Sequence, residues 1–345
     1  MHEESAVPFS DLTTLRLGGP ARRVVTASTY DEVIEVVRET DAAGEPLLVL
    51  GGGSNLVVAD EGFPGTALRL DLREYAELPD TTALSFGAGV DWDAVVRHTV
   101  DAGYAGLEAL SGIPGLVGAA PIQNIGAYGQ EVAQTIVSVR VLDRTTYEVV
   151  ELAGEECGFA YRDSVFKRTS RYVVLRVSFA LRRSEWGAPI RYAELARALG
   201  VSIGDWVPLG DVRAAVLHLR ERKGMLLDPA DHDTWSAGSF FTNPVLAAAD
   251  AERLPPEAPR WPERDGQIKT SAAWLIERAG FGKGYGAGTG SGRARLSSKH
   301  SLALTNRGGA TTADLLALAR ELRDGVEARF AIRLVPEPVL VNCAL

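Results

Sequence analysis

One serine of the sequence stands in an unusual setting. Ser239 lies between a glycine and two phenylalanines, in the segment WSAGSFFTNP of residues 235–244. The segment lacks the G-x-S-x-G frame of a hydrolase nucleophile elbow. A buried serine hydroxyl commonly bonds to its own backbone. The alternative is a proton donor held beside a reacting carbon, and the segment alone leaves both interpretations open.

Two glycine-rich segments could approach a ligand through their backbones. In GGGSN, residues 51–55, successive amides can form a concave site for a pyrophosphate, and a tight turn between strands fits equally well. A Rossmann turn fits poorly, because G-x-G-x-x-G is absent and a strand-like segment follows. Small residues predominate in residues 111–131, where a buried loop would leave many amides without partners. We therefore predict that this second segment lies against a large planar cofactor.

Several charged side chains are further candidates, each with a simple alternative. Arg162 and Lys167 flank an apolar strip, and a surface ion pair would explain either of them. Lys223 ends a predicted helix, where a cation is stabilised by the helix dipole. The histidines lack the spacing of metal ligands, so no metal site is predicted; they include His98, His218 and His300.

The composition excludes several classes of function. With 345 residues, 46% of them hydrophobic, the chain is long enough for two domains. A net charge of -9 argues against a nucleic-acid partner. Cys157 and Cys343 form neither a disulfide framework nor a zinc site. The N-terminus lacks a signal-peptide pattern, and no apolar run reaches the about 20 residues of a membrane span, so we expect a soluble, cytoplasmic protein with no membrane partner.

The first half of the chain reads as an α/β region. Strands are expected at residues 21–29 and 46–58, the latter interrupted by the glycine turn, with a helix at 30–44 between them. Further strands and a helix follow up to residue 106. A hairpin that turns at Asp143 and Arg144 is predicted from alternating residues.

From about Asp228 onward the chain reads as a second α/β unit, which a further helix precedes. A helix over residues 207–225 is predicted with Asp211 as its N-cap. Helices at residues 270–280 and 312–329 follow, with a strand at 302–306 between them. The last strand carries Glu337 between two prolines, which suggests a sheet edge or a chain end.

Taken together, the motifs resemble the UDP-N-acetylenolpyruvoylglucosamine reductase family (UDP-N-acetylmuramate dehydrogenases) of the vanillyl-alcohol-oxidase-like FAD-binding superfamily. The motifs are GGGSN, IPGLVGAAPIQNIGAYG, YRDSVFK, AGSFFTNP, AAWLIE and the terminal PEP. They occur in the family's order from about residue 10 to the C-terminus. PIQNIGAYG, and Tyr192 in PIRYAEL, resemble type I of the family, which has an extra tyrosine-bearing loop.

The resemblance implies an α/β (α+β) fold with a FAD-binding module and a substrate-binding domain. The module, of the vanillyl-alcohol-oxidase/PCMH type, has two α/β subdomains and is expected at residues 1–205, with its core at about 14–184. The C-terminal α/β substrate-binding domain is expected at residues 206–331. A C-terminal strand, residues 332–345, is expected to return to the active site.

The resemblance also implies an activity in peptidoglycan synthesis. NADPH would reduce non-covalent FAD, whose N5 would deliver hydride to C3 of UDP-N-acetylglucosamine enolpyruvate, giving UDP-N-acetylmuramate with ping-pong kinetics. Arg162, Ser239 and Glu337 match the family's catalytic residues, with Ser239 protonating C2. The implied substrate-binding residues are Tyr192, Lys223, Asn243 and His300, the last at a position where the family often has a glutamine. The implied FAD-binding residues lie in the two glycine-rich segments: Gly51, Gly52, Gly53, Ser54, Asn55, Ser111, Gly112, Ile113, Pro114, Gly118, Gln123, Asn124, Gly126, Ala127 and Tyr128.

Two other functions remain open. One is another FAD-dependent oxidase or dehydrogenase of the same superfamily; many of these attach flavin through His or Cys, and no histidine lies in either glycine-rich segment. The other is a catalytically inactive, nucleotide-sugar-binding regulator, although all three catalytic residues are present. A monomer is expected. A third glycine-rich stretch, residues 280–292, has no assigned function, and a flexible surface loop is its simple explanation.

Overall fold

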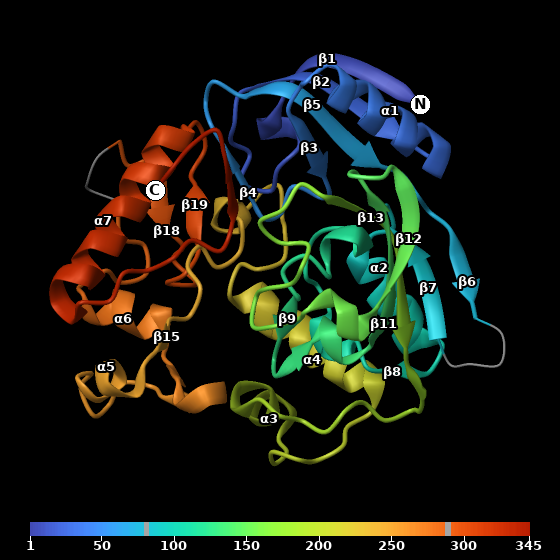
Figure 1. The fold of residues 1–345 in the computed structure, drawn as a ribbon. Helices are drawn as coiled ribbons and strands as arrows, with labels where there is room; N and C mark the ends of the chain where they lie inside the picture. The colour runs from blue at the N-terminus through green and yellow to red at the C-terminus, as the bar shows by residue number, and fades with distance from the viewer. Residues whose placement is uncertain (79–82, 287–290) are drawn as a thin grey trace. The chain divides into compact units, whose positions relative to one another are not determined.

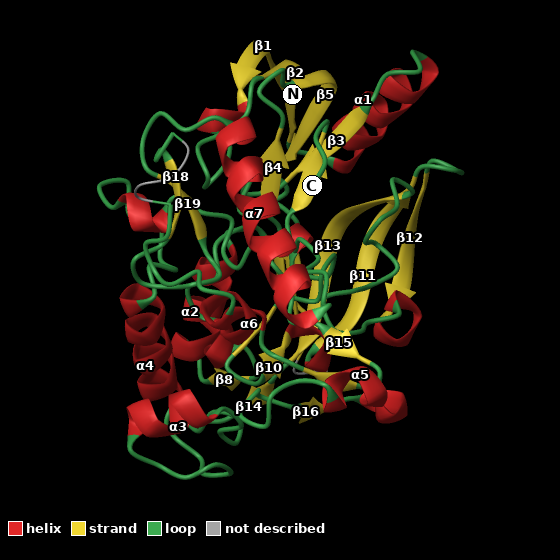
Figure 2. Cartoon of the chain, turned by 90° about the vertical axis from the view of Figure 1, so that its left-hand side faces the viewer, coloured by secondary structure: helices red, strands yellow, loops and turns green. Residues whose placement is uncertain are grey.

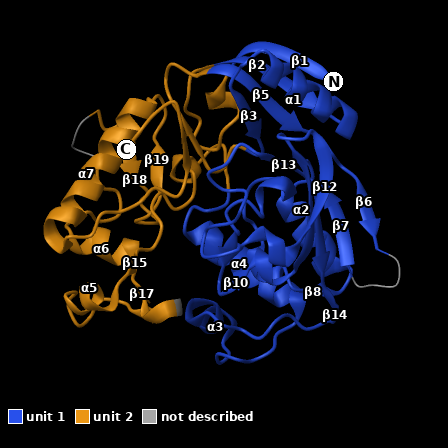
Figure 3. Ribbon diagram, in the orientation of Figure 1, with its two compact units in different colours: residues 1–7, 21–52, 64–226 blue, residues 8–20, 53–63, 227–345 orange. Residues whose placement is uncertain are grey.

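The computed structural model describes residues 1–78, 83–286 and 291–345 (Figure 1). These residues divide into two units (Figure 3). The first unit contains residues 1–7, 21–52 and 64–226. The second contains residues 8–20, 53–63 and 227–345, so two short N-terminal segments belong with the C-terminal part of the chain. The main division falls at residue 226, and the functional boundaries at 205 and 331 stay a prediction.

The first unit begins with a four-stranded sheet in the order β1-β2-β5-β3. Its strands and its helix are β1 (His2–Pro8), β2 (Pro20–Ala27), α1 (Tyr30–Ala42), β3 (Leu47–Leu50) and β5 (Phe63–Leu70). Thr29 caps α1 by accepting a hydrogen bond from the amide of Glu32, and Gly44 follows the helix at a φ of +63°. Buried valines of α1 pack on apolar residues of β2 and β5, as the apolar periodicity predicts.

A five-stranded antiparallel sheet in the order β12-β11-β13-β7-β6 forms the second layer of this unit. Its strands are β6 (Tyr75–Glu77), β7 (Ala83–Gly87), β11 (Ile136–Asp143), β12 (Glu148–Ala153) and β13 (Tyr172–Ala180). Figure 2 shows β11, β12 and β13 side by side. The predicted hairpin turn after Asp143 is confirmed. Helix α2 (Trp92–Asp101) shares an apolar core with this sheet, in which the ring of Trp92 meets that of Phe179.

Shorter elements complete the first unit. They are β8 (Tyr104–Ala105), β9 (Gly126–Ala127), β10 (Gln130–Glu131), β14 (Arg182–Arg183), α3 (Ala193–Leu199) and α4 (Leu209–Arg222). The N-cap residue of α4 is Pro208, so the prediction of Asp211 as the cap is wrong. Asp211 lies inside the first turn, where its negative charge still stabilises the positive end of the helix dipole.

The second unit has its own apolar core, built mainly around its long last helix. Its elements are β4 (Leu56–Val58), β15 (Val245–Leu246), α5 (Ala248–Glu252), β16 (Trp261–Pro262), β17 (Ile268–Lys269), α6 (Ala272–Arg278), β18 (Ala294–Leu296), β19 (Leu304–Asn306), α7 (Thr312–Phe330) and β20 (Val339–Val341). Thr311 and Asp314 form a capping box at the start of α7. The α/β class predicted from the sequence is confirmed.

Short 3₁₀ helices join these elements in both units: Phe9–Asp11, Glu108–Leu110, Val117–Ala119, Val132–Gln134, Gly154–Cys157, His232–Thr234 and Arg264–Gly266. Of the third glycine-rich stretch, residues 287–290 lie outside the described residues. Its described beginning packs on α7, because the Phe281 ring lies against Gly325 and the Tyr285 hydroxyl donates to Glu321 at 2.6 Å. This beginning of the stretch is therefore a packed turn.

Gly53, in the turn after β3, provides a test of how strongly the backbone there is constrained. Its φ is +63°, and a Cβ at this position would come within 1.9 Å of the Leu12 carbonyl oxygen. Gly44 has the same φ, and a Cβ added there would meet nothing within 4 Å. We predict that Gly53→Ala lowers the free energy of unfolding by more than about 2 kcal/mol, whereas Gly44→Ala costs about 1 kcal/mol. Denaturant unfolding of both variants measures this, and equal losses would contradict it.

Candidate active site

Ser239 presents a hydroxyl that is available to a ligand. Its side chain is half-buried and makes no hydrogen bond with the described part of the chain. The preceding Gly238 has a φ of +72° and donates its amide to Ser236 Oγ, so Ser236 is the serine of this turn that bonds locally. Phe240 and Phe241, each 1% exposed, follow directly. The interpretation of Ser239 as a hydroxyl bonded to its own backbone therefore finds no support.

The end of the chain lies along the segment that follows Ser239. The amide of Glu337 donates to the carbonyl oxygen of Phe240 at 2.8 Å, and the amide of Thr242 donates to that of Val335 at 3.1 Å. In the sequence Pro-Glu-Pro, Glu337 is the one residue with an amide hydrogen. This hydrogen bond places Glu337 opposite Phe240, which is the residue next to Ser239 in the sequence.

Asn55 fixes Glu337 from the other side. Its side-chain amide donates to the Glu337 carbonyl oxygen at 3.4 Å, and its own carbonyl oxygen accepts from the amide of Val339 at 2.9 Å. The Asn of GGGSN is thus joined to the Pro-Glu-Pro segment within the second unit. Its expected role in cofactor binding stays a prediction.

The two predicted substrate-binding residues of the second unit, Asn243 and His300, lie in segments that hydrogen bonds hold in place. Asn243 Oδ1 accepts from the amide of Ala272 at the start of α6, which leaves its NH₂ group without an acceptor among the described residues. The His300 amide donates to Ser297 Oγ, and Leu302 accepts from the amide of Phe240 at 2.8 Å. The loop that carries His300 thereby joins the segment that follows Ser239.

Asp233, which the sequence analysis did not identify, fixes this loop. It is buried and accepts hydrogen bonds from the amide and hydroxyl of Ser298 and from the guanidinium of Arg307. Burial opposes its ionisation, but the hydrogen bonds from Ser298 and the charge of Arg307 outweigh burial and lower the pKa of Asp233. Lys299 is held in turn by Asp231 at 2.5 Å.

Arg162 lies in the first unit, against the second glycine-rich segment. Its guanidinium donates to the carbonyl oxygens of Asn124 at 3.2 Å and Gly126 at 2.7 Å. A Cβ on Gly126 would come within 2.9 Å of Arg162 Nη1, so the missing side chain makes room for the guanidinium. Lys167 donates to the Arg162 carbonyl oxygen at 2.6 Å. The family motif YRDSVFK therefore folds back onto the segment IQNIGAYG.

The sequence suggested that a buried loop at residues 111–131 would leave many amides without partners, and for most of that segment this expectation is wrong. Amides between residues 117 and 125 are largely paired within the segment's own turns or with the turn after β7; that of Gly118, for example, donates to the carbonyl oxygen of Ala88. The glycines serve close packing, since a Cβ on Gly118 would come within 2.6 Å of the Ala88 Cβ. The side chain of Asn124 is engaged too, with the carboxylate of Glu131, the carbonyl oxygen of Ala160 and the amide of Ala133.

Two other features fit a bound FAD. The amides of Gly51, Gly52 and Gly53 donate no hydrogen bond to the described residues, so they are available to a pyrophosphate. Arg220 Nε is buried and has no acceptor within the described part of the chain. Arg220 packs beside Gly112, where its Cδ would be 3.3 Å from an added Cβ. Such an orphaned N–H suits an electronegative ring edge, so FAD fits the residues present.

Four residues of the first unit form a polar group that we term the tyrosine cluster: Tyr128, Tyr192, Glu194 and Lys223. The two phenol rings meet edge to face with centroids 5.7 Å apart, and Lys223 Nζ lies 5.6 Å from the Tyr128 ring. Lys223 pairs with Glu194 at 2.6 Å. Desolvation raises the pKa of Tyr128 to about 12 and also raises that of Tyr192, so both keep their protons at neutral pH.

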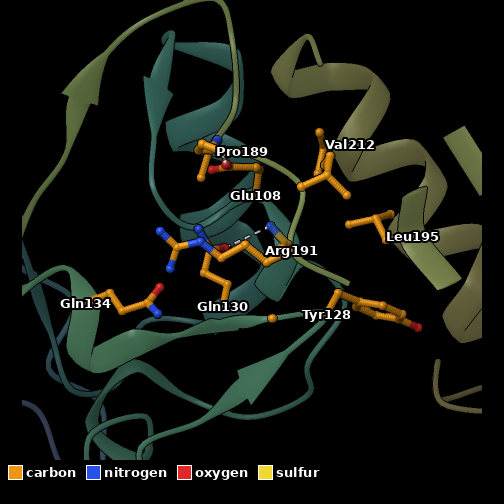
Figure 4. A pocket seen from close by; sticks show the side chains of 12 residues that line it. Glu108, Tyr128, Gln130, Gln134, Pro189, Arg191, Leu195 and Val212 are labelled. Carbon is orange, nitrogen blue, oxygen red and sulfur yellow. Dashed lines mark hydrogen bonds between the residues drawn. The ribbon is translucent and has the colours of Figure 1, made fainter. Parts of the chain in front are cut away.

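A cavity of about 240 Å³ is lined by Tyr128, Gln130 and Glu108, among other residues (Figure 4). Buried Glu108 accepts from the amides of Gly106 at 2.7 Å and Ala188 at 2.6 Å, and Gln130 Oε1 accepts from the amide of Ala109. These bonds fix the segment that leads to Tyr192. None of the three predicted catalytic residues lines this cavity.

The structure thus groups the predicted site residues in two sets. Arg162, Tyr192 and Lys223 lie in the first unit, the last two in one cluster, and Ser239, Asn243, His300 and Glu337 lie in the second. Their roles stay a prediction. Glu194 and Asp233 were missed because their partners are distant in sequence, and Arg220 because the burial of its Nε cannot be read from the sequence. No helix in the described ranges is long and apolar enough to cross a bilayer, and the residues described offer no cluster of three metal-ligating side chains.

Comparison with known proteins covers both units. Residues 21–153 match the FAD-binding domain, and residues 228–341 match the "UDP-N-acetylenolpyruvoylglucosamine reductase, C-terminal domain". The UDP-N-acetylenolpyruvoylglucosamine reductase of Thermobifida fusca is 59% identical over 98% of both chains. That of Salinispora arenicola is 55% identical over all of this chain and 97% of its own. The crystal structure of the Thermus caldophilus reductase matches with a TM-score of 0.69 and 28% identity over 99% of each chain. The chain therefore belongs to the UDP-N-acetylenolpyruvoylglucosamine reductase family.

Proposed function

We propose that this chain reduces UDP-N-acetylglucosamine enolpyruvate to UDP-N-acetylmuramate with NADPH, a step of peptidoglycan synthesis. The observation that carries the proposal is the unpartnered hydroxyl of Ser239 beside Glu337, in a chain of this family. Bound FAD supplies the hydride relay between NADPH and the enolpyruvyl group. We further propose that the chain acts in the cytoplasm as a monomer, which predicts a 36.9 kDa species in solution.

Backbone and guanidinium groups would hold the cofactor. The free amides of Gly51, Gly52 and Gly53 suit the pyrophosphate, and Arg220 offers its buried Nε to an electronegative group. The remaining predicted FAD-binding residues supply backbone at close approach. Among them, Gly126 also makes room for Arg162.

Arg162 is suited to the carboxylate end of the substrate. Hydride addition at C3 drives negative charge into C2 and the carboxylate oxygens, and that charge must be stabilised as it forms. A guanidinium is planar, always charged and able to bind a carboxylate through two N–H groups. Two carbonyl contacts orient the group in advance. A carboxylate at Glu337 would repel the developing charge, so Glu337 helps as a neutral acid or by orienting Arg162.

Ser239 supplies the proton for C2. The hydroxyl is a weak acid, but a carbanion-like centre is a strong base, so the transfer is favourable. Ser239 then regains a proton from solvent, which balances hydride at C3 with a proton at C2. The buried Phe240 and Phe241 limit access of water from the neighbouring side.

Substitution of Ser239 tests this role directly. We predict that Ser239→Ala leaves bleaching of the flavin absorbance by NADPH near normal, because no proton on C2 is needed for that half-reaction. Return of the absorbance on addition of the enolpyruvyl substrate should slow by roughly 10²–10³-fold. Anaerobic stopped-flow absorbance measures the two half-reactions separately.

A conservative variant serves as the control for Ser239→Ala. Ser239→Cys keeps a proton donor of similar size and should recover part of the second half-reaction. Rapid return of the absorbance in the alanine variant would exclude Ser239 as the acid.

The contact between Gly126 and Arg162 gives a second prediction. Gly126→Ala places a methyl group against the guanidinium and the Gln130 carbonyl oxygen, each 2.9 Å from the added Cβ. Displacement of the guanidinium should lower kcat by about 10²-fold. Gly210→Ala, where nothing lies within 4 Å, is the matched control and should keep full turnover. A folded Gly126→Ala enzyme with normal kcat would disprove the placement of Arg162 in catalysis.

The kinetic order gives a third prediction. NADPH and the substrate both carry a nucleoside diphosphate, so we expect them to compete for Lys223 and Tyr192 and to bind in turn. Initial velocities at several fixed NADPH concentrations should give parallel double-reciprocal lines. Intersecting lines would show that both bind together and would contradict this order.

A further inference from the structure

Glu194 is the one residue of the tyrosine cluster that has no role in the proposed reaction. It lies in the first turn of α3, two residues after Tyr192. Its Oε2 accepts from Lys223 Nζ at 2.6 Å, and the two side chains are 34% and 31% exposed. An ion pair that is one-third exposed can be reached, and broken, by a charged ligand from solvent.

Without Glu194, the cluster would be an anion-binding site. Lys223 contributes a positive charge, and the two phenols are hydroxyl donors because they keep their protons. Neither hydroxyl donates to another described residue. An ammonium and two unused hydroxyls from separate elements are the groups that a phosphate binds through charge-assisted hydrogen bonds.

Glu194 neutralises this site by occupying its cation. A carboxylate and a phosphate oxygen bind an ammonium in the same way, so a phosphate that binds Lys223 must displace Glu194 from it. The positive charge of Arg220 also lies near Tyr128 and favours ionisation of its phenol. Nη2 of Arg220, however, already donates to the Met225 carbonyl oxygen. Lys223 is therefore the charge for which Glu194 and a ligand would compete.

We propose that Glu194 competes with the phosphates of the nucleotide ligands for Lys223 and so limits their affinity. This inference rests on the proposed function, in which NADPH and the sugar nucleotide follow one another at the enzyme. Each turnover then requires the release of one nucleoside diphosphate before the next binds. A carboxylate that returns to Lys223 favours that release.

The test is the affinity of the flavin-loaded enzyme for UDP, measured by isothermal titration calorimetry at fixed low ionic strength. Glu194→Gln keeps the size of the side chain and removes its charge. UDP should bind about fivefold more tightly to this variant, the effect of a partly exposed ion pair. Uridine, which has no phosphate, should bind equally to both enzymes.

Two variants separate the specific pair from general electrostatics. Glu221→Gln removes the same charge from α4, two residues from Lys223, where the side chain is 74% exposed. It should change UDP affinity by less than about twofold. In a Lys223→Met background, Glu194→Gln should give no gain, because the contested cation is absent.

The outcomes are distinct. Unchanged or weaker UDP binding by Glu194→Gln overturns the inference, and so does an equal gain from Glu221→Gln. The proposed function fails in a different experiment, if the wild-type enzyme does not turn over the enolpyruvyl sugar nucleotide with NADPH. An enzyme that turns over normally, with UDP affinity indifferent to Glu194, refutes the inference about Glu194 alone.

Discussion

The backbone hydrogen bond from the amide of Glu337 to the carbonyl oxygen of Phe240 joins the end of the chain to the segment that carries Ser239. The prolines on both sides of Glu337 cannot donate, so Glu337 supplies the one amide of Pro-Glu-Pro to this pairing, and the Thr242 amide supplies a second bond, to Val335. Asn55 holds the same residue through its carbonyl oxygen. Three segments from the beginning, the middle and the end of the chain therefore meet at the turn that carries Ser239. The Ser239 hydroxyl makes no hydrogen bond with the described residues, and the paired neighbouring segments fix its position.

In the first unit, neighbouring groups likewise hold the positively charged side chains in defined positions. The carbonyl oxygens of a glycine-rich segment orient Arg162, and the absence of a side chain at Gly126 makes space for it. Arg220 and Lys223, both near Tyr128, differ in their partners. Arg220 has a buried N–H without an acceptor in the described chain, and Lys223 has a carboxylate that a phosphate could replace. The two cations are thus suited to a resident group and to an exchanging ligand respectively.

Local patterns in the sequence predicted the elements well and their contacts poorly. Apolar periodicity and end residues such as Thr29 and Gly44 give helix α1, because both signals act within a few residues. Asp211 was wrongly taken as a cap, since Pro208 occupies the N-cap position three residues earlier. Unpaired amides were expected where 3₁₀ turns pair them, and the pair of Glu194 with Lys223 joins two helices across 29 positions of sequence. The family motifs supplied the predicted site residues, whose roles stay a prediction, but not the residues that hold them.

The central claim is that the purified chain carries a flavin that passes electrons from NADPH to the enolpyruvyl sugar nucleotide. An anaerobic absorption spectrum tests it most directly. The account predicts flavin bands that disappear when NADPH is added and return when UDP-N-acetylglucosamine enolpyruvate follows. A chain without flavin bands, or bands that NADPH bleaches and the sugar nucleotide does not restore, would contradict it.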